Sequence, residues 1–386
     1  MKSFVNEPRR RGGVVNEIRR LGGRRRSDKD LSFEIGKMPR SILSEMLVVC
    51  GRVGSEASAA YEAKAKELEA DFISETGRSW VLALKTLQKN YDPGTHSGVL
   101  LIGTNKELPA TQISHGGYYG FTDWFIQDVD GDGAPDTPVG RIFGPPETVL
   151  YHMDPMIIDS NIAVVFDSQP GRSTRHVEGL KELGFEVEVL REFSEEDSGL
   201  LSVCEFILQF SDGMFDMRIH GTPEKWASHN SVILDHTQAS SIKFEGYPVV
   251  YSEACSTAQE GPLLRAFLDQ GACYIGATLD TMNNLEPFDD WRECAYADGW
   301  KFGFLDLLDT HELIGTVKIG VDRAIYDNLA DSVKRELEDV RSGENVEIAT
   351  DNALSAAEWV IFGNPLRRTT VGPQADFTPG KLLVDT

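Results

Sequence analysis

Two segments of the sequence decide the fold and point to its chemistry: MFDMRIHG (Met214–Gly221) and YPVVYSEAC (Tyr247–Cys255). Each begins with a short apolar run that is typical of a buried strand, and each delivers a reactive side chain, His220 in the first and Cys255 in the second. Functional groups gather outside the carboxyl ends of parallel strands, so we expect this histidine and this cysteine to meet at one edge of a sheet.

The rest of the chain repeats this pattern of buried strands and helices. Further apolar runs lie at Gly98–Gly103, Asn161–Phe166, Phe185–Leu190 and Ala272–Ile275. Helical patterns lie at 56–71, Arg175–Leu183, Leu200–Phe210, Pro262–Gln270, Trp300–Leu308, Ile314–Leu329 and Asn352–Val360. The alternation predicts an α/β fold with a mainly parallel sheet flanked by helices on both faces.

Charge is divided unevenly along the 386 residues. The formal net charge is -23, but residues 1–40 hold twelve Lys and Arg against five Asp and Glu, so the head carries +7 and the remainder -30. An acidic body argues against nucleic acid as a partner and is compatible with cations or basic peptides. The basic head has the composition of a flexible arm or propeptide.

The sequence shows no run of about 18 apolar residues and no apolar core of a secretory signal, so we expect no membrane span and a cytoplasmic or already processed protein. The five cysteines are odd in number and lack CxxC spacing, which argues against a disulfide framework or a zinc site.

A cysteine and a histidine that meet in this way are suited to acyl transfer. The thiol needs a base to become a thiolate, and an imidazole supplies one near neutral pH. The backbone N–H groups of Gly221 and Cys255 could stabilise the developing oxyanion. Either feature alone has an ordinary structural explanation, a core cysteine or a His-Gly turn.

Five segments resemble the gingipain family of the caspase-like clan of cysteine peptidases, in the family's order. They are Val99–Gly103 with Leu108-Pro109, Asp130–Asp136 with Val139–Ile142, Ile219–Gly221 with Trp226, Ser252–Cys255 with Gly271–Gly276, and Phe362–Pro365. The resemblance implies a three-layer caspase-like fold of two side-by-side halves and a cysteine endopeptidase with Cys255 and His220 as its dyad. We therefore expect four parts of the chain: the basic arm at 1–40, an N-terminal α/β subdomain at 41–155, a caspase-like catalytic subdomain at 156–370 and a C-terminal tail at 371–386.

Several residues near the expected dyad could line the S1 pocket, which holds the side chain before the scissile bond. Glu253 lies two residues before Cys255 on the same side of an extended chain, where it would favour Arg or Lys, or it would pair with a core arginine. Asp167 also favours a basic residue, whereas Arg172 and Arg175 favour an acidic residue or Asn. We expect cleavage after Arg or Lys.

The loop from Asp128 to Asp136 carries carboxylates at positions 1, 3, 5 and 9 of a calcium-loop pattern, from Asp128, Asp130, Asp132 and Asp136. Position 12 is Val139 instead of the usual Glu, so the alternatives are a structural Ca²⁺ site and an ordinary Asp/Gly turn. The chemistry itself requires no cofactor.

His115 also precedes a glycine, but His115-Gly-Gly117 with Tyr118-Tyr119 indicates a loop with no strand leading into it, so His220 is the preferred base. The predicted function is endoproteolysis of polypeptides through a thioester, with self-cleavage after Arg24–Arg26. The alternatives are a catalytically silent relative that binds peptides or partners, and a transpeptidase. The sequence does not indicate the oligomeric state.

Overall fold

The computed structural model describes residues 35–75, 77–158, 162–167, 174–191, 214–218, 220–227, 232–241, 248–281, 290–294, 297–308, 313–343 and 347–368. The basic arm as far as residue 34, the helix expected at Leu200–Phe210 and the C-terminal tail lie outside these residues.

The strands follow one another along the whole described chain. They are β1 (Ile35–Lys37), β2 (Met46–Cys50), β3 (Asp71–Ser74), β4 (Gly98–Ile102), β5 (Thr111–His115), β6 (Tyr118–Thr122), β7 (Val139–Ile142), β8 (Met156–Ile158), β9 (Ile162–Asp167), β10 (Glu186–Arg191), β11 (Met214–Arg218), β12 (His220–Thr222), β13 (Lys225–Ala227), β14 (Val232–Asp235), β15 (Val249–Ser252), β16 (Cys273–Ala277) and β17 (Trp359–Phe362).

Helices connect most of the strands. They are α2 (Arg40–Leu43), α3 (Ser55–Leu68), α4 (Trp80–Asn90), α5 (Trp124–Gln127), α6 (Pro146–Met153), α7 (Thr174–Glu182), α9 (His236–Ser241), α10 (Pro262–Asp269), the 3₁₀ turn η1 (Trp291–Glu293), α11 (Ala297–Leu308), α12 (Ile314–Asn328), α13 (Asp331–Ser342) and α14 (Asp351–Ala357).

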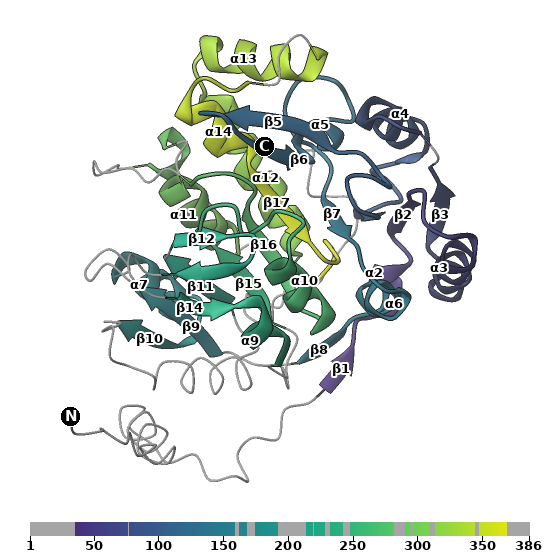
Figure 1. The fold of residues 1–386 in the computed structure, drawn as a ribbon, viewed down its shortest axis with the longest axis horizontal. Coiled ribbons are helices and arrows are strands. Elements are labelled where there is room, and N and C mark those ends of the chain that lie inside the picture. The colour runs from purple at the N-terminus through teal and green to yellow at the C-terminus, as the bar shows by residue number, and fades with distance from the viewer. Residues whose placement is uncertain are drawn as a thin grey trace, which may run out of the picture.

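Ten strands form one sheet in the order β10-β9-β11-β15-β16-β17-β7-β4-β2-β3 (Figure 1). Neighbouring strands run parallel except for the pair β16 and β17, which is antiparallel. Four strands from residues 46–142 form one end of the sheet, and β17 joins them through β7 to the other five, where Phe362 pairs with Arg141. The α/β fold with a mainly parallel sheet, expected from the sequence, is confirmed.

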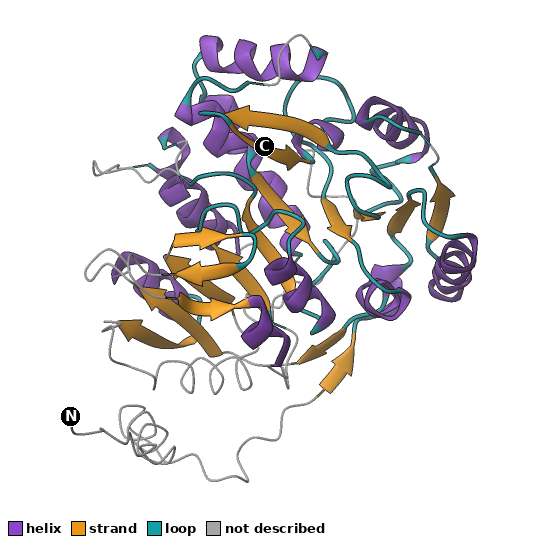
Figure 2. Cartoon of the chain, in the orientation of Figure 1, coloured by secondary structure: helices purple, strands orange, loops and turns teal. Residues whose placement is uncertain are grey.

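Helices cover both faces of this sheet (Figure 2). In β15, Val250 points to the face covered by α10, while Val249 and Tyr251 point to the face covered by α11 and α12. Side chains on both faces of β15 are buried, because successive side chains of a strand point to opposite faces of the sheet and helices cover each face. The strand that leads to Cys255 is therefore held from both sides.

Aromatic rings stack beneath the end of β15. The rings of Tyr251 and Trp359 lie 5.4 Å apart at 9°, and those of Trp300 and Trp359 lie 4.8 Å apart at 11°. All three side chains are buried. The stack joins β15, β17 and α11 into one rigid floor under the loop that carries the cysteine.

Two expectations from the sequence are wrong. The helical pattern at Asn352–Val360 ends at Ala357 in α14, and Trp359 and Val360 already belong to β17. His115, expected in a loop, ends strand β5, which pairs with β6 through the two-residue turn Gly116-Gly117. Both glycines have positive φ, +56° and +86°, as a type I′ hairpin turn requires.

Candidate active site

Cys255 lies three residues beyond the carboxyl end of β15 in a tight loop. Ser256 has a φ of +58°, which turns the chain, and its N–H donates to the carbonyl of Leu279 at 2.8 Å. The Ala258 N–H donates to the Ala277 carbonyl at 3.0 Å. These bonds tie the cysteine loop to the end of the next strand, β16, and so fix it at the carboxyl edge of the sheet.

Strand β12 brings His220 and Gly221 against this loop. A Cβ placed on Gly221 would lie 2.3 Å from Thr257 Cγ2, 2.7 Å from the Cys255 carbonyl oxygen and 2.8 Å from Ala254 Cβ. The backbone at Gly221 is therefore in direct contact with the cysteine loop, and only a residue without a side chain fits there. The structure describes the backbone of His220, which immediately precedes this contact.

Cys255 is the one half-buried cysteine among the four in the described part of the chain, since Cys50, Cys273 and Cys294 are buried. Burial raises the pKa of the Cys255 thiol above its ordinary value, and hydrogen bonds with Thr281 lower it in part. Its Sγ lies 3.5 Å from Thr281 Oγ1. The sulfur is thus protonated near neutral pH and needs a base to react.

Asp280 and Glu358 lie near this sulfur, and a negative charge on either carboxylate raises the pKa of the thiol further. The Glu358 side chain is fully buried, and within the described ranges neither of its oxygens has a hydrogen-bond partner. Burial raises the pKa of this carboxyl well above its ordinary value, and the charge of Asp280 adds to the effect. Sequence reasoning missed this residue, because the helical pattern at Asn352–Val360 includes it and indicates no site.

Glu253 occupies the interior instead of an open pocket. Its carboxylate lies 2.8 Å from Lys301 Nζ, and both side chains are almost completely buried, at 1% and 0% exposure. An S1 carboxylate would need to reach a substrate cation, whereas this one already has a cation from α11. Glu253 thus forms the core ion pair that was the alternative to a place in the S1 pocket, although its partner is a lysine and not an arginine.

The structure describes the backbone of two of the other three S1 candidates, Asp167 and Arg175. Asp167 ends β9, and its Cα is paired with that of Arg218, two residues before His220, so its backbone lies at the same edge as the dyad segments. Arg175 belongs to the first turn of α7. Arg172 lies outside the described residues.

His115 has partners away from the cysteine loop. Its Nδ1 lies 2.7 Å from the Ile348 carbonyl oxygen, and its Nε2 lies 3.5 Å from Asp351 Oδ1. These contacts hold the β5–β6 hairpin against the start of α14. They give His115 a structural explanation.

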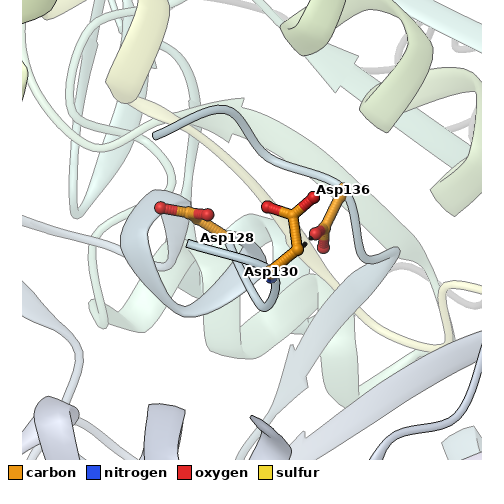
Figure 3. Close-up of side chains that lie close together, drawn as sticks. All are labelled: Asp128, Asp130 and Asp136. Carbon is orange, nitrogen blue, oxygen red and sulfur yellow. Dashed lines mark hydrogen bonds between the residues drawn. The ribbon is translucent and has the colours of Figure 1, made fainter. Parts of the chain in front are cut away.

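Three of the four predicted metal ligands converge. One carboxylate oxygen from each of Asp128, Asp130 and Asp136 lies within 4.8 Å of the others, in the loop between α5 and β7 (Figure 3). Asp132 instead pairs with Arg323 of α12, at 2.8 Å. This acidic triad has the hard oxygen donors that a metal such as Ca²⁺ prefers.

The triad is held together by its own loop and by one arginine. The N–H groups of Gly131 and Gly133 donate to Asp128 at 2.8 and 3.1 Å, and Arg341 Nη2 lies 3.1 Å from Asp128 Oδ2. Burial raises the pKa of Asp128 to about 6, although Arg341 opposes the shift. Burial also raises the pKa of Asp136. The buried negative charge is thus only partly compensated.

No family model and no curated protein matches this sequence. A solved structure titled as a protease matches with a TM-score of 0.58 and 16% identity, over 84% of this chain and 78% of that chain. A D-isomer specific 2-hydroxyacid dehydrogenase from Lactobacillus delbrueckii ssp. bulgaricus, in an NAD complex, covers 76% of this chain and 98% of its own at 9% identity and a TM-score of 0.23, too low to support an argument. The fold is therefore protease-like.

Within the described ranges, none of the helices has the length and apolar character needed to cross a membrane.

Proposed function

We propose that this chain is a cysteine endopeptidase with Cys255 as nucleophile and His220 as acid and base. The observation that carries the proposal is the contact of Gly221 with the carbonyl of Cys255, which holds the backbone next to His220 against the cysteine loop. The protease-like fold supports peptides as substrates.

The geometry supports a two-step acyl transfer. His220 would remove the proton from the Cys255 thiol, whose raised pKa leaves it protonated, and the thiolate would attack the peptide carbonyl. His220 would then protonate the leaving amine as the thioester forms, and later activate water to hydrolyse the thioester. The Cys255 N–H forms no hydrogen bond to another residue of the described chain, so it is available to stabilise the oxyanion together with the Gly221 N–H.

For the residue before the scissile bond we propose Arg or Lys. With Glu253 paired to Lys301, the acidic group that supports this preference is Asp167, at the end of β9 beside the strand that leads to His220. Exchange of Asp167 for Asn should reduce the preference for a basic residue. Cleavage after Asn or Asp in the unaltered protein would assign the pocket to Arg172 and Arg175 instead.

The first test is hydrolysis of a fluorogenic peptide library by the wild type, Cys255→Ala and the matched variant Cys273→Ala. Cys273 is buried, with its pKa raised by burial to about 12, so its removal tests whether any thiol suffices. We expect activity in the wild type and Cys273→Ala only, and one iodoacetamide adduct fewer by intact mass in Cys255→Ala than in the wild type. Equal activity in Cys255→Ala contradicts the proposal, and no cleavage at all favours the silent peptide binder.

We also propose that the acidic triad binds a structural Ca²⁺ ion. Its test is the rise in melting temperature on adding calcium, which binding to the folded state produces. Asp130→Asn should abolish this rise, whereas the control Asp132→Asn should retain it because Asp132 pairs with Arg323. The same melting temperature with calcium and with chelator would contradict the proposal.

A further inference from the structure

A cleft of about 150 Å³ adjoins the turn that follows His220 and the loop that follows Cys255. Pro223, in the turn after His220, lines one side, and Ala258, Gln259 and Glu260, which follow Cys255, line another. The two segments touch, because a Cβ on Gly261 would lie 2.5 Å from both Pro223 Cβ and the Pro223 carbonyl oxygen. The cleft therefore adjoins the cysteine loop on the side of the histidine hairpin.

Aromatic rings from strand β6 form the rim. Tyr119 and Phe121 line the cleft and are 61% and 40% exposed, which is unusual for side chains of this size. Their strand is fixed against the cysteine loop, since Gln259 Nε2 donates to the carbonyls of Tyr119 at 3.4 Å and Thr278 at 2.8 Å. Gly120, between the two rings, packs directly on Leu279. The exposed rings thus have a defined position beside the cleft.

Glu260 supplies a carboxylate to the interior of the cleft. Its Oε1 accepts a hydrogen bond from the Asn105 N–H at 2.5 Å, and no other residue in the described ranges forms a hydrogen bond or ion pair with this side chain. Burial raises the pKa of Glu260, the Arg141 charge lowers it, and Asp123 raises it again. A half-buried carboxylate of this kind gains from a cation that enters the cleft.

Among the described residues that line the cleft, Arg141 is the one cation, and its guanidinium already has partners. Arg141 donates two hydrogen bonds to Asp123, at 2.9 and 2.6 Å, and two more to the carbonyls of Gly103 and Leu108. Glu260 keeps its hydrogen bond from Asn105, but no cation of the described residues forms an ion pair with it. A carboxylate below two exposed aromatic rings matches a long cationic side chain, whose stem packs on the rings while its head pairs with the carboxylate.

We infer that this cleft is a subsite for a Lys or Arg side chain on the leaving-group side of the scissile bond. The inference rests on the proposed peptidase function for its direction, because the histidine protonates the leaving amine and the cleft adjoins the histidine hairpin at Pro223. Its volume equals that of about five water molecules at roughly 30 Å³ each, enough for one extended side chain.

The test uses amines as acceptors for the acyl group. Argininamide or norvalinamide is added to the enzyme and a peptide ester, and mass spectrometry measures the ratio of aminolysis to hydrolysis. In aminolysis the amine forms a peptide bond to the acyl carbon, the thioester C–S bond breaks, and the proton of the amine returns to the thiol through the imidazole. We expect argininamide to be preferred about tenfold, the effect of a typical charge-assisted hydrogen bond.

Three variants test which side chains produce the preference for argininamide over norvalinamide. Glu260→Gln should abolish it, Tyr119→Ser should weaken it at an exposed position that the fold does not need, and the exposed control Glu147→Gln should retain it. Equal use of the two amines by the wild type, or an unchanged ratio in a folded Glu260→Gln protein, would overturn the inference.

A binding measurement separates this inference from the proposed function. Titration calorimetry of argininamide and norvalinamide into full-length Cys255→Ala protein requires no turnover. Tighter binding of argininamide that Glu260→Gln removes supports the subsite even if no peptide is ever cleaved. Equal binding of both amides overturns the subsite even if the protein proves to be a peptidase.

Discussion

Substitution of Gly221 by alanine tests the contact on which the proposed dyad depends. The new Cβ would lie 2.3 Å from Thr257 Cγ2 and 2.7 Å from the Cys255 carbonyl oxygen, whereas carbon atoms pack at about 3.5–4.0 Å. The hairpin must therefore move away from the cysteine loop by roughly 1 Å. A displacement of that size in a catalytic group costs about 100-fold in rate, and overpacking costs about 1–3 kcal/mol of unfolding free energy.

The assay compares kcat/KM on a fluorogenic peptide and urea unfolding for wild type, Gly221→Ala and Gly179→Ala. Gly179 is a suitable control because its Cβ would meet only Leu305 Cδ1, at an ordinary 3.4 Å. Adding Thr257→Ser to Gly221→Ala removes the nearest atom, Cγ2, and retains the hydroxyl that donates to the Ala254 carbonyl, so part of the activity should return. Wild-type kcat/KM in a folded Gly221→Ala protein would refute the reasoning.

Three further predictions concern buried ionisable groups. Lys301→Met should lower the unfolding free energy by about 3–5 kcal/mol because it leaves the Glu253 carboxylate without its cation, and adding Glu253→Gln should recover most of the loss. Burial lowers the pKa of His152 from 6.5 to about 4, so the unfolded chain takes up the proton first as the pH falls. The free energy of unfolding should therefore fall by about 3 kcal/mol between pH 6.5 and 4 in the wild type, and urea unfolding of His152→Gln should show no such fall. An equal fall in both proteins would contradict this prediction. The raised pKa of Glu358 has the opposite effect on the pH dependence of stability, since the unfolded chain releases its proton first as the pH rises. The unfolding free energy of Glu358→Gln should therefore increase relative to that of the wild type from pH 4.5 to 7.5. A constant difference between the two proteins would count against this prediction.

The strands that position the candidate site could be predicted from the sequence because they are short apolar runs followed by polar residues. The runs that end near His220 and Cys255 became β11 and β15, which pair directly with each other. The hairpin β5–β6 could not be predicted, because Gly116-Gly117 is equally typical of a loop. In the structure both glycines adopt the positive φ that reverses a hairpin.

Side-chain partners distant in sequence could not be predicted. Glu253 carries no local sign that Lys301 of α11 reaches it, and Asp132 carries none that Arg323 of α12 does. Such pairs form where helices pack onto loops, and that packing is set by the tertiary structure. The same limit applies to Glu358, which directly follows the last residue of α14 and is buried by the tertiary packing around it.

The stacked indoles of Trp300 and Trp359 give this protein an optical signature. Two nearly parallel chromophores 4.8 Å apart in a fixed, chiral setting couple their electronic transitions, so they should produce a strong near-ultraviolet circular dichroism signal. That signal depends on tertiary packing and disappears when packing is lost even if secondary structure remains. Because Tyr251 of β15 lies on the same stack, the spectrum reports the integrity of the strand beneath Cys255 without any label.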